Sequence, residues 1–316
     1  MRKGKMNRIP VSLIVDDGGP VNMFFFHDPG NLHELLVPPA FAAEFAAVCS
    51  RCGIKGKFSV VPMPAGLGRI DSKICGVPSR NVREYIRIIK NRIEPVFSVT
   101  PEILTHYRAY DMKSGGFMHV FEDVLFSRLT AEEVAEYTGL ALTILIRAGL
   151  TPSGITSPWV CGLDNEKNYA AGIGMAFKKV MGIDRCFYFL HCGDEVNKPV
   201  LMNNSEKTGR VVSIPNNTFD AFWHTQKPIG SRAAVANVRK KIDRLLSPDG
   251  KSGRIRELYE QGLPITLISH GQSLYSDGRG IGLKGLEALA ERIRKIFGNQ
   301  VEWMSFVELA DNWNYQ

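Results

Sequence analysis

The sequence has 316 residues, of which 44% are hydrophobic, and it carries a formal net charge of +7. This composition is typical of a folded globular protein, and the chain contains no apolar run of about 18 residues that would predict a transmembrane helix. Its basic residues are scattered and accompany no nucleic-acid-binding motif, so we expect neither a nucleic-acid nor a membrane partner. The N-terminus lacks the apolar core of a signal peptide, which predicts a cytoplasmic protein.

Short apolar runs predict buried strands along the chain, at residues 11–15, 57–61, 95–99, 186–190, 211–215 and 265–269. Segments with helical periodicity separate them, most clearly at residues 130–150, 231–246 and 282–298. The first of these begins with a capping-box pattern, Thr130 and Glu133, and the last ends at Gly298. Alternating strands and helices predict a parallel α/β sheet or barrel, in one domain over residues 1–316 with a core at about 11–313.

Polar residues follow several of these strands. Asp16 and Asp17 end the first strand, His106 follows the third, and His270 comes directly after the last. In parallel α/β folds the carboxyl ends of strands gather functional groups. A carboxylate with neutral imidazoles is a site for a divalent metal such as zinc, and the cation would relieve the repulsion between the two aspartates. With a second carboxylate as base and a further histidine as acid, the pattern predicts a metal-assisted hydrolase.

The order of these motifs resembles the polysaccharide deacetylase family, also called carbohydrate esterase family four. The matching segments are LIVDDGG, EILTH, TSPW and LISHG, at residues 13–19, 102–106, 156–159 and 267–271. The resemblance extends over residues 11–313. It implies a distorted (β/α) barrel of seven strands, with its site at the carboxyl ends of the strands. It also implies hydrolysis of an amide C–N bond, as in deacetylation of an N-acylated carbohydrate or another small acylated substrate.

The same resemblance implies roles for individual residues. Asp16 would be the general base and His270 the general acid. The backbone N–H of Trp159 would help to hold the oxyanion. Asp17 and His106 would bind a divalent metal, with zinc as the expected ion.

Two positions depart from the family pattern. Tyr110 stands four residues after His106, where the family has its second metal-binding histidine, and Thr156 stands where an arginine pairs with the base. An inserted segment before residue 130 contains His119, which we therefore expect as the third metal ligand. The other candidates for this ligand are Asp111, Tyr110 and His27.

Two other functions stay open. A barrel that has lost its metal would bind carbohydrate without catalysis, whereas a glycosidase would use two carboxylates across the site. GIGLKG at residues 280–285 matches G-x-G-x-x-G, but it does not directly follow a strand, so we expect a helix start instead of a nucleotide site. Cys49 and Cys52 form a C-x-x-C without a second pair, which indicates buried thiols instead of a zinc ribbon.

Overall fold

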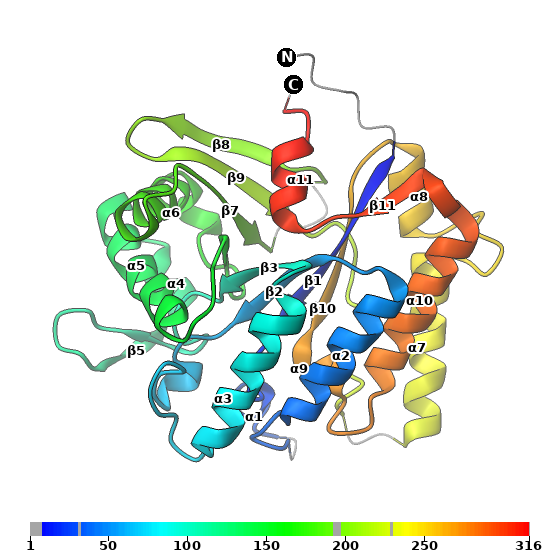
Figure 1. The fold of residues 1–316 in the computed structure, drawn as a ribbon, viewed down its shortest axis with the longest axis horizontal. Coiled ribbons are helices and arrows are strands. Elements are labelled where there is room, and N and C mark those ends of the chain that lie inside the picture. Colours follow the sequence, from blue (N-terminus) through cyan, green and yellow to red (C-terminus); the bar gives the residue numbers. More distant parts are fainter. Residues whose placement is uncertain (1–7, 31–32, 192–196, 228–229, 316) are drawn as a thin grey trace.

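The computed structural model describes residues 8–30, 33–191, 197–227 and 230–315. It has the α/β architecture with parallel strands that the sequence predicts (Figure 1). One sheet has the order β10-β1-β2-β3, with β11 also paired to β1, and all of its pairings are parallel. Its strands are β1 (Ile9–Asp16), β2 (Gly56–Val60), β3 (Phe97–Pro101), β10 (Ile265–His270) and β11 (Val301–Trp303).

A second sheet has the order β6-β7-β9-β8, in which only β8 is antiparallel to its neighbour. Its strands are β6 (Gly154–Thr156), β7 (Arg185–Leu190), β8 (Val200–Ser205) and β9 (Gly209–Pro215). An isolated parallel bridge between Glu102 and Thr156 joins the two sheets. The expected strands of the parallel core are therefore confirmed, whereas the short strands β6, β8 and β11 were not separately predicted.

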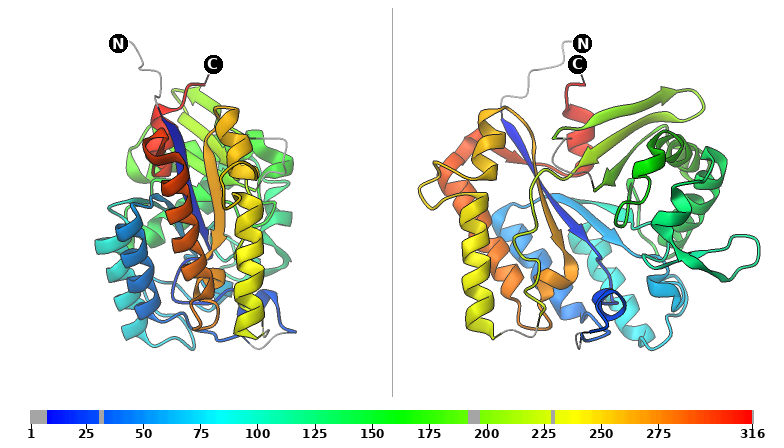
Figure 2. Two further views of the ribbon diagram at one scale, coloured as in Figure 1. Left: turned by 90° about the vertical axis from the view of Figure 1, so that its right-hand side faces the viewer. Right: turned by 180° about the vertical axis from the view of Figure 1, so that it is seen from behind.

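The seven-stranded closed barrel is not confirmed. Across the described residues, β9 and β10 do not pair as strands. The segment after β9 runs beside β10 instead (Figure 2), and its side chains make the connection. Asn217 Oδ1 accepts a hydrogen bond from the backbone N–H of Thr266 at 2.9 Å, and the hydroxyl of Thr218 donates to the carbonyl of Thr266 at 3.0 Å. The parallel strands thus form an open arc.

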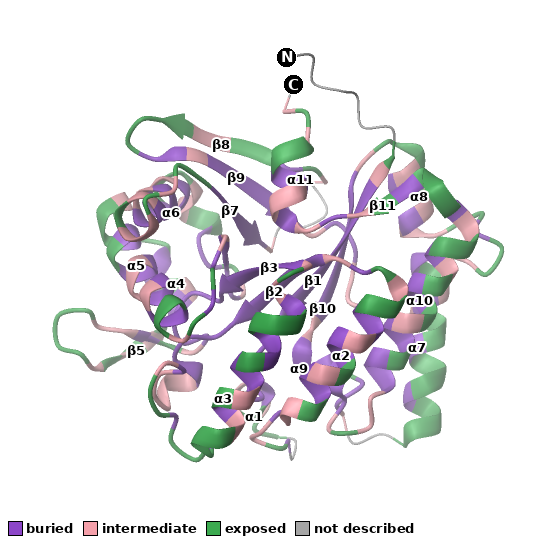
Figure 3. Ribbon diagram, viewed as in Figure 1, coloured by how far each residue is buried: buried purple, intermediate pink, exposed green. Residues whose placement is uncertain are grey.

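The longer helices cover the outside of this arc, with their buried faces toward the strands and their exposed faces outward (Figure 3). The longer ones are α2 (Pro39–Cys52), α3 (Ser79–Ile88), α5 (Ala131–Arg147), α6 (Glu166–Met181), α7 (Ser231–Leu245) and α10 (Ile281–Phe297). The shorter ones are α1 (Phe24–His27), α4 (Glu122–Phe126), α8 (Arg254–Glu260), α9 (Gly271–Tyr275) and α11 (Phe306–Asn312). Of these, α11 packs between the two sheets. No helix in the described part of the chain has the length and apolar character required to cross a bilayer.

Local sequence signals explain where the predicted helices begin and end. Thr130 and Glu133 form the predicted capping box of α5, in which each side chain bonds the other residue's backbone N–H. Helix α10 ends at Gly298, whose φ of 52° lies in the left-handed region that favours glycine. Seven consecutive residues of β1 are buried because the parallel sheet is covered on both faces.

A hairpin of two antiparallel strands, β4 (Arg108–Tyr110) and β5 (Phe117–Phe121), projects from the body of the molecule (Figure 1). It contains most of the segment that the sequence marks as an insertion. Exposed and half-buried residues alternate along β5, as expected for a strand with one solvated face. His119 lies on the exposed face.

Candidate functional site

The predicted base and acid lie on neighbouring strands. Asp16 ends β1 and is in register with His270, which ends β10. A cleft of about 730 Å³ opens at this end of the sheet, and its walls include Asp17, Glu102, His106, Trp159, His191 and His270. The structure therefore gathers functional groups at the carboxyl ends of strands from both sheets, as parallel α/β folds do.

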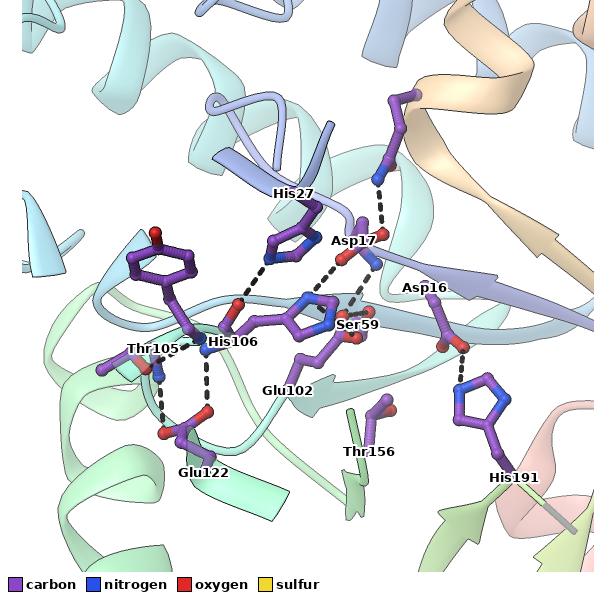
Figure 4. A network of polar contacts seen from close by, with 12 residues as sticks. Asp16, Asp17, His27, Ser59, Glu102, Thr105, His106, Glu122, Thr156 and His191 are labelled. Atoms are coloured by element: carbon purple, nitrogen blue, oxygen red, sulfur yellow. Dashed lines mark hydrogen bonds and ion pairs between the residues drawn. The ribbon is translucent and has the colours of Figure 1, made fainter. Parts of the chain in front are cut away.

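Asp17, Glu102 and His106 form a buried group whose ligand atoms all lie within 4.8 Å of one another (Figure 4). His106 Nδ1 is 2.5 Å from Asp17 Oδ1 and 3.5 Å from Glu102 Oε1. The other oxygen of Glu102, Oε2, accepts hydrogen bonds from the backbone N–H of Asp17 at 2.7 Å and from the Ser59 hydroxyl at 2.6 Å. Three potential ligand atoms consequently face a common point.

This group concentrates negative charge in a buried position. Burial raises the pKa of Glu102, and the neighbouring Asp17 raises it further, to about 7. Burial alone lowers the pKa of His106, but the charges of Asp17 and Glu102 outweigh it and raise this pKa to about 9. Burial alone would raise the pKa of Asp17, but His106 holds it well below its usual range. Both raised pKa values show that the group favours an added positive charge.

The donor set fits a divalent cation. Asp17 Oδ1 and His106 Nδ1 are buried and lie 2.5 Å from each other, and neither hydrogen-bonds a described group outside the three potential ligands. Two carboxylates and one imidazole are ligands that divalent metals such as zinc and manganese accept, and three protein ligands are usual where a coordination position must stay open for catalysis. A metal would be held by Asp17, Glu102 and His106.

The loop that carries His106 is fixed from below by Glu122, the first residue of α4. Its carboxylate accepts hydrogen bonds from the backbone N–H groups of Thr105 at 2.9 Å and His106 at 2.8 Å. The hydroxyl of Tyr137 donates to the same carboxylate at 2.8 Å. These contacts hold His106 at a φ of 47°, which residues other than glycine seldom adopt. Backbone strain of this kind is typical of functional sites.

Asp16 lies beside this group but has different partners. Its Oδ1 accepts a short hydrogen bond from the ammonium of Lys57, a fully buried residue of β2. Its Oδ2 lies 3.2 Å from Nε2 of His191, which follows β7. Burial alone would raise the pKa of Asp16, but Lys57 and then His191 outweigh it and lower this pKa to about 2. Asp16 is therefore an ionised carboxylate with a cation already beside it.

His270 is oriented by Asp220 and Trp223. Nδ1 of His270 lies 2.8 Å from Asp220 Oδ2, and the Trp223 ring packs edge-on against the imidazole at 4.5 Å between centroids. Burial alone lowers the pKa of His270, but the hydrogen bond and charge of Asp220 raise it to about 9. With Nδ1 bound to Asp220, Nε2 is the nitrogen left for a ligand.

The structure brings five of the six predicted site residues to this end of the sheet: Asp16, Asp17, His106, Trp159 and His270. His119 lies elsewhere. It is exposed on the projecting hairpin, and the third member of the buried group is Glu102, four residues before His106. His27 is close to His106, with 4.6 Å between ring centroids, but its Nε2 faces the backbone carbonyl of His106 at 2.8 Å.

Four residues of the site were missed from the sequence, and three of them left a signal. Glu102 is the first letter of the EILTH segment and has the four-residue spacing to His106. His191 follows a predicted strand directly, as Asp16 and His270 do. Lys57 is a charged residue at the start of an otherwise apolar run, which is unusual in a covered parallel strand. Asp220 lies in a loop and left no signal.

No family model and no curated protein matches the sequence. Solved structures with a similar fold include the allantoinase PuuE, with 13% identity, a TM-score of 0.48, and coverage of 97% of this chain and 90% of that one. A probable polysaccharide deacetylase from Pseudomonas aeruginosa PAO1 has 13% identity, a TM-score of 0.46, and coverage of 97% and 91%. A GH57 branching enzyme from Thermococcus kodakaraensis has 12% identity, a TM-score of 0.49, and coverage of 98% and 72%. Similarity at this level assigns neither a family nor an activity.

Proposed function

We propose that this protein is a metal-dependent hydrolase of amide C–N bonds, most simply a deacetylase of an N-acylated carbohydrate. One observation carries the proposal: the three potential ligands Asp17, Glu102 and His106 lie next to a carboxylate base, Asp16, with a histidine acid, His270, in the same cleft. Metal-assisted hydrolysis of an unactivated amide uses these three kinds of group, because the carbonyl is unreactive and the amine leaves poorly without a proton.

Each residue has a defined task in this proposal. Asp17, Glu102 and His106, the ligand group, would hold a divalent cation, which would supply the Lewis acidity for this hydrolysis. Asp16 Oδ2, the oxygen that Lys57 leaves free, accepts the proton of the attacking water. His270, kept protonated by Asp220, donates its proton from Nε2 to the departing amine. The backbone N–H of Trp159, on the wall of the cleft, is the proposed donor to the oxyanion.

Carbohydrate is the proposed substrate class because of the motif resemblance, and aromatic rings along the cleft are compatible with it. Trp159 and Trp223 both line the cleft, near His106 and His270 respectively. The two rings can pack against the apolar faces of sugar rings, leaving sugar hydroxyls for polar residues such as Asn216.

The glycosidase alternative draws on Glu102, because a carboxyl group with a pKa raised to about 7 could act as a general acid. However, both oxygens of Glu102 face the Asp17 and His106 group, and Oε2 already accepts two hydrogen bonds. Amide hydrolysis gives the ligand group, Asp16 and His270 each a task, whereas glycoside hydrolysis would leave the ligand group without one.

The proposal is tested by comparing two classes of variant for bound metal and for amine release from N-acetylated chito-oligosaccharides. Asp17→Ala and His106→Ala should lose both the metal and the activity, because each removes a ligand atom. Asp16→Asn should keep the metal and lose turnover by at least about 100-fold, because it removes only the proton acceptor. Wild-type protein that takes up no metal, and that binds these oligosaccharides without hydrolysing them, would support the carbohydrate-binding alternative instead. Metal occupancy unaffected by Asp17→Ala and His106→Ala would place the metal elsewhere.

A further inference from the structure

Lys57 is a buried charged residue to which the proposed reaction has given no direct task. It belongs to β2, and none of its side chain is exposed to solvent. Its ammonium donates to Asp16 Oδ1 and to the Thr156 hydroxyl, the latter at 2.7 Å, and it lies 4.6 Å from the centroid of the Phe189 ring. The lysine therefore reaches from the first sheet to the edge of the second, where Thr156 ends β6.

We propose that Lys57 is the positioning residue for Asp16: it binds one oxygen of the carboxylate and thereby directs the other toward the water-binding side of the cleft. This inference rests on the proposed function. In the family pattern an arginine that pairs with the base stands at position 156; here Thr156 is neutral, and the ammonium of Lys57 bonds its hydroxyl from β2.

The division of labour between the two oxygens of Asp16 supports this role. Oδ1 is bound by Lys57, whereas Oδ2 makes no contact with Lys57 and lies 3.2 Å from Nε2 of His191, a residue of the cleft wall. A carboxylate held at one oxygen cannot rotate freely, so its second oxygen, Oδ2, keeps a fixed direction. Fixed direction is what a proton acceptor requires, since a small misplacement of a reacting group costs a large factor in rate.

Stability alone does not account for the pair. Removing a lysine and an aspartate from water carries a large desolvation cost, and apolar side chains of similar volume usually serve a core at least as well. Neither residue lines the open cleft, but Asp16 is next to Asp17 in the chain and in register with His270, and both of those residues line it. A charge pair at this position is explained by its effect on Asp16.

The test measures kcat, KM and bound metal for Lys57→Met, which has nearly the same shape but no charge. We expect kcat for N-acetylated chito-oligosaccharides to fall about 100-fold, which lies within the usual range for a general base. KM and metal content should stay within about twofold, because Lys57 touches neither the ligand group nor the open part of the cleft. Lys55→Met is the matched control, since Lys55 pairs with Glu308 at 2.8 Å outside the cleft, and it should leave kcat unchanged.

A relocated cation separates positioning from a merely structural role. The Thr156 hydroxyl lies 2.7 Å from the Lys57 ammonium, so side chains from these two positions reach the same place. The double variant Lys57→Met/Thr156→Lys should therefore have a kcat at least tenfold higher than that of Lys57→Met. If Lys57→Met does not fold, Lys57→Leu is measured in its place, because it also removes the donor to Asp16 Oδ1.

The outcomes are distinct. A kcat equal to that of the wild type in a folded, uncharged Lys57 variant overturns the inference. A fall in kcat that is fully explained by a loss of bound metal also overturns it. A double variant that folds and binds metal but recovers nothing also overturns it. Wild-type protein that binds metal and hydrolyses no acylated amine overturns the proposed function, and the positioning role with it.

Discussion

Asp16 and Asp17 are adjacent in the chain, but their carboxylates lie in opposite electrostatic environments. Asp16 meets a resident cation, Lys57, whereas Asp17 faces a second buried carboxylate, Glu102, with His106 as the nearest balancing charge. The chain separates the two by a sharp change of direction, since Asp17 has a φ of 55° at the end of β1. Two like charges are thus placed side by side without sharing partners.

The difference between the two aspartates indicates which part of the site depends on an external ion. The Asp16 region is complete within the protein, because one buried lysine neutralises one buried carboxylate. The Asp17 region has two carboxylates for one imidazole: burial and then the charge of Asp17 raise the pKa of Glu102, and the two carboxylates raise that of His106 against the effect of burial. A divalent cation would displace the protons that these groups otherwise retain.

The difference between the Asp16 and Asp17 regions is tested most strongly at Glu102, where we expect the largest effect of a substitution. Glu102→Gln keeps the size of the side chain and can still accept from Asp17 and Ser59, but it removes one negative charge and one ligand oxygen. We expect affinity for zinc to fall by at least about 100-fold, because only two ligand side chains remain. Isothermal titration with zinc measures this directly.

His119→Ala is the control for Glu102→Gln, because His119 is the third ligand that the sequence predicts. It is exposed on β5 and should leave zinc affinity unchanged. The opposite result, with tight binding in Glu102→Gln and weak binding in His119→Ala, would show that the hairpin folds over the site when metal binds. The Asp17 region would then include His119 as a metal ligand in place of Glu102.

A smaller effect is expected on the acid side of the cleft. Asp220→Asn should lower the pKa of His270 from about 9, because the carboxylate that stabilises the imidazolium is lost. Since His270 must be protonated to act as an acid, the alkaline limb of the kcat profile should move to lower pH by about one to two units. At pH 8 the protonated fraction of His270, and with it the rate on amides, should fall by about 2-fold for a shift of one unit and about 10-fold for a shift of two.

The leaving group provides the check on this assignment. A para-nitrophenyl ester releases an acidic phenol that departs without a proton, so its hydrolysis should be much less affected by Asp220→Asn than hydrolysis of an amide. Bound metal should be unchanged, because neither Asp220 nor His270 belongs to the ligand group. An alkaline limb that does not move would remove His270 from the role of acid.

Much of the fold followed from local patterns. Apolar runs predicted the strands β1, β2, β3, β7, β9 and β10, and the caps at Thr130 and Gly298 fixed the ends of two helices. Strand ends then located Asp16 and His270 on one edge of the sheet. These features depend on neighbours in sequence. The connection between β9 and β10 does not depend on sequence neighbours. The segment between these strands contacts β10 through the side chains of a loop, where no periodicity is visible in the sequence.

The partners of the predicted residues were harder to find because they come from distant parts of the chain. Lys57 and Asp220 reach Asp16 and His270 across separations of 41 and 50 residues. His119 illustrates the opposite error. A histidine in an inserted segment is a reasonable ligand by composition, but the antiparallel pairing of β4 with β5 places it on a solvated strand face. Spacing within EILTH was the better guide, since Glu102 and His106 do lie together.

The smallest effect concerns the support beneath His106. Tyr137→Phe removes the hydroxyl that donates to Glu122 at 2.8 Å and accepts from the backbone N–H of Tyr110 at 3.0 Å. Glu122 then has one donor fewer, and its pKa, which burial already raises to about 7, should rise further. A less firmly held Glu122 allows His106 more freedom, so zinc affinity should fall by a modest factor of about 10, as for other groups that support a metal ligand.

The Asp16 region lies apart from this support, so the contact between Lys57 and Asp16 should be retained in Tyr137→Phe. Zinc titration at pH 7 measures the loss, and Tyr259→Phe, in which a partly exposed hydroxyl bonded to Gln300 is removed, is the matched control that should show none. Unchanged zinc affinity in a folded Tyr137→Phe protein would mean that the backbone of the loop holds His106 without help from Glu122.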